Sequence, residues 1–110
     1  MAVAVLRPKS LAKGTLPTTY ATLYTAGPAP SDGSAKVLAN ITLCNTGGAA
    51  VTVVITVAGG TSILNGFTLP GNDTYIHPKP VMLNGGEVIA GSASAASVHY
   101  IIDGLEASDT

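Results

Sequence analysis

Charge is the scarcest property of this chain. Only 10% of its 110 residues are charged, against a usual share of about 25% in soluble domains. Residues 37–72 contain no Asp, Glu, Lys or Arg at all. With a net charge of -1, the chain lacks the basic patch that binding a phosphate backbone requires. We therefore expect no nucleic-acid partner, and we expect the uncharged stretch to lie on a surface that neighbouring subunits cover.

Cysteine and long apolar runs are also scarce. The single Cys44 cannot form an internal disulfide, so the fold does not depend on an oxidising compartment. Its position in an apolar strand predicts a buried, unreactive thiol. No apolar run approaches the length of about 20 residues that spans a bilayer, and the first residues do not have the pattern of a signal peptide. We expect no membrane partner.

Turn residues and alternating strands make up much of the chain, which contains 13 Gly and 7 Pro. In residues 36–45 the odd-numbered positions up to 43 are apolar, and in residues 51–57 every odd-numbered position is Val or Ile. This period of two predicts strands. We expect these two strands to form a hairpin across Gly47 and Gly48, and residues 81–83 and 87–90 to form a second hairpin. Further strands are expected at residues 20–25, 62–69, 73–77 and 97–102.

The number and spacing of these segments predict the fold class. About eight short strands and no helix indicate an all-β protein, an antiparallel β-sandwich or jelly roll. Residues 19–106 are expected to form the sandwich domain and residues 107–110 a C-terminal tail. Residues 1–18 are expected to form an extended N-terminal arm, because Pro8, Gly14 and Pro17 should prevent any long regular element.

Groups that could carry out catalysis are few. His77 and His99 lie far apart in the sequence, the carboxylates number six, and no metal-binding, phosphate-binding or nucleophile motif is present. Strand and turn roles explain both histidines and Asp73. We expect no catalytic residue, no metal ligand and no cofactor, and hence no enzyme.

The few charged residues are sorted along the chain. Basic residues stand near the start and acidic residues near the end, so the two ends could meet within one subunit or dock between adjacent subunits. The outward positions of the uncharged strands are the other expected contact sites. The residues predicted for an interface are Arg7, Lys9, Leu38, Asn40, Thr42, Thr52, Val54, Thr56 and His99.

Several short motifs occur in an order that resembles a group of small structural proteins from tailed bacteriophages and prophages. They are Leu-Tyr-Thr at residues 23–25, Ile-Thr-Leu-Cys-Asn-Thr at 41–46, Val-Thr-Val at 51–53, Leu-Asn-Gly-Gly-Glu-Val-Ile at 83–89 and Ala-Ser-Ala at 93–95. The resemblance covers most of residues 23–104. The chain departs from the pattern where Gly86 lengthens one turn and where a proline-rich loop follows Thr25. The resemblance implies a virion component and transfers no catalytic residue.

From these observations we expect a non-enzymatic phage structural protein. It would decorate or cement the capsid shell as a homo-oligomer such as a trimer, with the major capsid protein or another virion protein as partner. Two alternatives stay open. One places the subunit in the tail, neck or fibre of the virion. The other is a carbohydrate-binding or adhesin module that uses Tyr20, Tyr24, Tyr75 and Tyr100.

Overall fold

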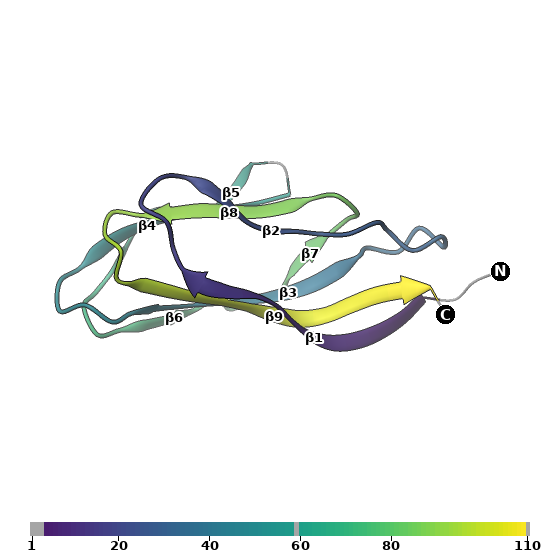
Figure 1. The fold of residues 1–110 in the computed structure, drawn as a ribbon, viewed down its shortest axis with the longest axis horizontal. Coiled ribbons are helices and arrows are strands. Elements are labelled where there is room, and N and C mark those ends of the chain that lie inside the picture. The colour runs from purple at the N-terminus through teal and green to yellow at the C-terminus, as the bar shows by residue number, and fades with distance from the viewer. Residues whose placement is uncertain (1–3, 59, 110) are drawn as a thin grey trace.

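The protein is a sandwich of two antiparallel sheets (Figure 1). The computed structural model describes residues 4–58 and 60–109, and these residues form nine strands and no helix, so none of them provides a helix that could cross a membrane. The predicted all-β sandwich is therefore confirmed. The strands are β1 (Ala4–Thr15), β2 (Ala21–Thr25), β3 (Val37–Asn45), β4 (Val51–Val57), β5 (Thr61–Leu69), β6 (Thr74–Ile76), β7 (Val81–Leu83), β8 (Val88–Ala93) and β9 (Val98–Asp109).

The strand order is that of a jelly roll. One sheet, which we call sheet A, has the order β1-β9-β3-β6, with β7 also paired to β3. The other sheet, sheet B, has the order β2-β8-β4-β5. Strands β6 and β7 pair with successive parts of β3, and Pro78 and Pro80, which have no N–H to donate to a ladder, stand between them. Counted as one interrupted strand, they give the eight strands and two four-stranded sheets of a jelly roll.

The two predicted hairpins are wrong. Strand β3 lies in sheet A and β4 in sheet B, and β7 and β8 are divided between the sheets in the same way. Within the described residues, β4 and β5 are the only strands consecutive in sequence that pair with each other. The reason is that β3 and β4 each have one strongly apolar face. These faces bury more surface when they oppose one another across the core than when the strands lie side by side.

Buried aliphatic side chains from both sheets form this core. The predicted inward faces are confirmed, since the odd-numbered residues 37–43 of β3 and 51–57 of β4 are buried. Strand β5 is irregular. Gly66 has a φ of 71° and is skipped in the pairing with β4, which is the geometry of a bulge.

The N-terminal segment is a strand of sheet A. Strand β1 pairs with β9 along its whole length, with one shift in register between Ser10 and Ala12, and the following Leu16 is buried in the core. The prediction that Pro8, Gly14 and Pro17 would prevent a long regular element was wrong. β1 is an edge strand, where a proline can turn its missing N–H toward solvent.

The C-terminal segment also differs from the prediction of a tail that starts at residue 107. Strand β9 continues to Asp109, and Ala107 is almost fully buried. Gly104 allows β9 to run this close to β3, because a Cβ at this position would collide with the carbonyl group of Leu38. Both chain ends therefore leave the sandwich at the same end (Figure 1).

Candidate interaction site

Metal-binding side chains do not cluster in the part of the chain that the structure describes. In residues 4–58 and 60–109, no three His, Cys, Asp or Glu side chains come together in a way that could hold a metal ion. His77 makes a hydrogen bond of 2.9 Å between its Nδ1 and the Tyr75 hydroxyl, and its backbone N–H donates to the Ile41 carbonyl. This strand-end role agrees with the sequence-based interpretation of His77.

The strands of sheet B carry no charge. Neither β2, β4, β5 nor β8 contains Asp, Glu, Lys or Arg, so every charged residue in a described strand belongs to sheet A. The outward positions of β4 are Thr52, Val54 and Thr56. Thr52 is exposed, whereas Thr56 is buried because its Oγ1 is hydrogen-bonded to the hydroxyl group of Tyr20, which lies outside the sheet.

The outward side of sheet A has a different composition. Register partners in an antiparallel sheet point to the same side. One surface therefore carries the even-numbered residues of β3, which are Leu38, Asn40, Thr42 and Cys44, and their register partners on β6, β7 and β9. It continues onto β1 through the register partners that these β9 residues have on β1. We call this surface the outer A face. The partner of Cys44 on β9 is His99. Cys44 is only partly buried, contrary to prediction, because even-numbered residues of β3 point away from the core.

Seven of the nine predicted interface residues therefore fall on two surfaces. Leu38, Asn40, Thr42 and His99 belong to the outer A face, whereas Thr52, Val54 and Thr56 lie on the outside of sheet B. The molecule is 53 Å long and about 20 Å thick, so a flat partner contacts one set or the other. The sequence suggested a single surface only because β3 and β4 were expected to be neighbours.

Exposed apolar side chains gather on the outer A face. Of the five large hydrophobic residues exposed in the described part of the chain, four belong to this face: Leu6, Ile76, Met82 and Ile101, which are 47–69% exposed. The fifth is Tyr20. Sequence reasoning missed all four as interface residues. For Met82 and Ile101 the available signal was alternation with buried residues in β7 and β9. Leu6 and Ile76 have no buried residue beside them in their strands, so this signal is missing for them.

Two hollows lie along this face. An apolar hollow of about 160 Å³ has Leu6, Leu38, Met82 and Leu105 in its lining. A wider, open depression of about 580 Å³ has the polar residues Ser10, Asn40 and Asp103 in its lining, together with Pro8 and Leu105. The face thus combines apolar side chains at one end with hydrogen-bonding groups near its middle.

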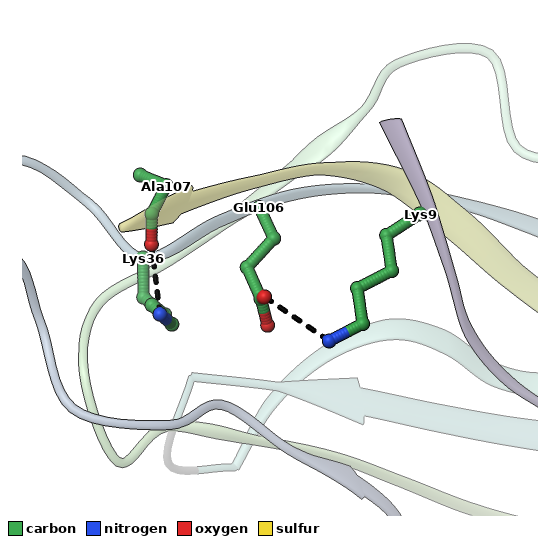
Figure 2. Close-up of polar contacts among 4 residues, drawn as sticks. All are labelled: Lys9, Lys36, Glu106 and Ala107. Carbon is green, nitrogen blue, oxygen red and sulfur yellow. Dashed lines mark hydrogen bonds and ion pairs between the residues drawn. The ribbon is translucent and has the colours of Figure 1, made fainter. Parts of the chain in front are cut away.

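Arg7 and Lys9 point away from the outer A face, since they alternate along β1 with Leu6 and Pro8. Figure 2 shows the Lys9 Nζ paired at 3.1 Å with Oε1 of Glu106, and the Lys36 Nζ donating to the carbonyl oxygen of Ala107 at 2.7 Å. The Lys9–Glu106 pair joins the two charged ends within one subunit, which is one of the two arrangements that the sequence left open. Because both residues belong to the same subunit, this pair is not the docking contact between subunits that was the other possibility.

The same charged pair influences Tyr24 of β2. Burial raises the pKa of the Tyr24 hydroxyl above its usual value of 10.0, and the negative charge of Glu106 raises it further, while Lys9 acts in the opposite direction. Burial and the Glu106 charge both favour the protonated, neutral form of this hydroxyl. Tyr24 is thus a neutral, partly buried group at neutral pH.

The four tyrosines do not form one platform. Tyr20 lies outside sheet B, and Tyr24 lies near the charged pair. The Tyr75 ring packs at 4.9 Å from that of Phe67, and Tyr100 lies beside Gly14. A carbohydrate ring needs several exposed groups on one surface, and these rings are dispersed over different parts of the sandwich.

Comparison with known proteins adds no family name to this description. No family model matches the chain, and no curated protein matches it either.

Proposed function

We propose that this chain is a non-enzymatic structural subunit of a tailed-phage virion, which decorates or cements the capsid shell as an oligomer. The observation that carries the assembly part of this proposal is the outer A face, where exposed Leu, Ile and Met side chains gather on one surface. Several large exposed apolar side chains on one surface, accompanied by polar groups, are typical of protein–protein interaction sites. The virion part comes from the sequence resemblance, because a jelly roll hosts many unrelated functions.

The uncharged outside of sheet B is the second surface that supports the proposal. A decoration subunit needs one surface for its own oligomer and another for the shell. The two outward faces of this sandwich differ in chemistry, since one is apolar with a few charges and the other has small, uncharged side chains. Contacts made by such surfaces depend mainly on desolvation, so we expect them to be weakly sensitive to salt.

The experiment that tests this function uses virions and empty heads purified from the phage or prophage that encodes the chain. The purified, labelled protein is incubated with these particles, and association is followed by co-sedimentation and electron microscopy. We expect saturable binding and added density at regular positions on the head shell. Density on the tail or neck would favour the tail alternative, and failure to bind either part would contradict the proposed function.

A further inference from the structure

The charges on the outer A face are of both signs and have no ion partner. Lys13 is the register partner of Ile101 and Asp103 is that of Ser10, so the two charged side chains are diagonal neighbours on this face. Within the described residues the one ion pair joins Lys9 to Glu106, which leaves Lys13 and Asp103 unpaired. Among the described residues, the outer A face therefore carries one cation without an ion partner on its edge strand β1 and one such anion on the adjacent strand β9.

This arrangement is complementary to itself. In a two-fold contact the same patch is contributed by both subunits, and a residue i that meets residue j is matched by j meeting i. A face with a single sign of charge would repel its own copy. Here a two-fold axis lying in the interface between the two groups brings each Lys13 near the Asp103 of the other copy. The exposed Leu and Ile side chains around them are then removed from water.

The size of a whole face is comparable with that of a standard interface. The molecule measures 53 Å by about 20 Å in the plane of the sheets, so a whole face has a projected area of about 1,000 Å², and each partner contributes roughly 800 Å² to a standard interface. We propose that the outer A face binds the outer A face of a second copy of this chain as a two-fold dimer. Lys13 of each copy lies opposite Asp103 of the other.

This inference rests on the oligomer in the proposed function. It adds to that function by naming a second copy of the chain as the partner of the outer A face. It favours a two-fold pair over the trimer expected from the sequence, because a flat face that meets itself generates two-fold symmetry. The outside of sheet B then remains free for the shell.

The test is the oligomeric state of the purified chain, measured by analytical ultracentrifugation. We expect a dimer at a protein concentration of about 100 µM, which lies well above the dissociation constant of a standard interface. Ile101→Glu and Thr42→Glu on the outer A face should weaken the dimer by about 30-fold or more, the effect of losing a central contact. Thr52→Glu makes the same change on the opposite face and should leave the dimer intact. Circular dichroism and thermal unfolding establish that each variant is folded.

Exchanging the two charges distinguishes a second copy of the chain from any other protein as the partner of the outer A face. Lys13→Glu and Asp103→Lys each place like charges across the two-fold axis at two equivalent points, and each should weaken its own homodimer by about ten-fold. Mixing the two variants restores opposite charges at both points, so the mixture should form a heterodimer of wild-type affinity. A monomeric wild type, a dimer unaffected by Ile101→Glu, or a mixture no tighter than its components would overturn the inference. Binding of monomers to phage heads would overturn it, and the oligomer in the proposed function with it, while leaving the proposed role on the capsid shell intact.

Discussion

Asn45 joins three loops at one end of the sandwich. Its side chain is fully buried and uses both donors and its acceptor. The Nδ2 group donates to the backbone carbonyls of Ala49, Leu69 and Pro70, and Oδ1 accepts from the Gly47 N–H and the Ser97 hydroxyl. A buried amide with this many partners fixes the loop by which the chain leaves β3 for the opposite sheet.

We predict that Asn45→Ala lowers the free energy of unfolding by about 2–4 kcal/mol, because several buried polar groups lose their partner. Urea unfolding followed by circular dichroism measures this change. Asn65→Ala, at an exposed position of β5, is the matched control and should change stability by at most about 0.5 kcal/mol. Equal effects of the two substitutions would contradict the role assigned to Asn45.

Tyr24 gives the fold a dependence on alkaline pH. Its hydroxyl pKa is raised in the folded protein above the value of 10.0 in the unfolded chain. As the pH rises above 10, the unfolded chain loses this proton while the folded protein still holds it, so the folded state is progressively disfavoured. The stabilising effect is complete below pH 10 and is lost as the pH rises through the folded-state pKa.

We therefore predict that the wild type loses more stability than Tyr24→Phe between pH 9 and pH 11, a range that includes the usual tyrosine pKa of 10.0. The phenylalanine variant keeps the ring and has no proton to lose. The measurement is chemical unfolding of both proteins across this pH range, and the difference between the two curves isolates Tyr24 from the other titrating groups. Parallel curves would show that the hydroxyl does not sense its surroundings.

At the level of the secondary-structure elements, β1 behaves as part of the sheet and not as an arm. It covers the edge of β9 over residues 99–109, and the chain then enters the core at Leu16. Lys9 and Lys13 on this edge strand, together with Pro8 and the shift in register, are features that discourage pairing with the edge of another sheet. Contact between copies is thus directed to the faces of the sandwich and away from this edge.

We predict that deletion of residues 1–16 abolishes cooperative thermal unfolding, because it removes Leu16 from the core and exposes the whole edge of β9. A graded version compares Leu16→Ala, which should cost about 2–5 kcal/mol, with Thr68→Ala at an exposed position of β5, which should cost at most about 0.5 kcal/mol. Calorimetry measures both. A truncated protein that melts like the wild type but no longer associates would instead restore the arm interpretation.

At the scale of the whole molecule, the jelly-roll order makes nearly all strand pairing non-local. Strand β1 pairs with β9, β2 with β8, and β3 with β6, β7 and β9. Each of these pairings closes a long loop before it gains any contact, and such folds form slowly. The β4–β5 hairpin, with Gly60 at a φ of 111° in its turn, is the local element from which the sheets can grow.

We predict that refolding takes milliseconds to seconds, on the order of other β-sandwich proteins of this size. Stopped-flow dilution from urea measures the rate. Val54→Ala, at a partly buried position in the β4–β5 hairpin, should slow folding, whereas Leu105→Ala, near the end of β9, should mainly speed unfolding. If Leu105→Ala slowed folding and Val54→Ala mainly sped unfolding, the early structure would lie in β9 and not in the β4–β5 hairpin.

Part of the candidate site could be predicted from the sequence. The outward positions Leu38, Thr42 and Thr52 follow from alternation, which depends only on the geometry of a single strand. The grouping of these positions depends on which strands are neighbours. Leu6, Met82 and Ile76 come from three segments separated by loops, so their gathering with Leu38 and Thr42 on one face is visible only once sheet A is assembled.

The sequence by itself determined that the chain is all-β, which faces of β3 and β4 are buried, and that residues 37–72 carry no charge. These properties are local, since alternation and composition act on each segment separately. Only the tertiary structure decided that β3 and β4 oppose each other across the core, that residues 4–15 complete sheet A, and that the outer A face is apolar. The physical reason is that burial of apolar surface is non-directional. Several pairings satisfy the same alternation, and the packing of the whole core selects among them.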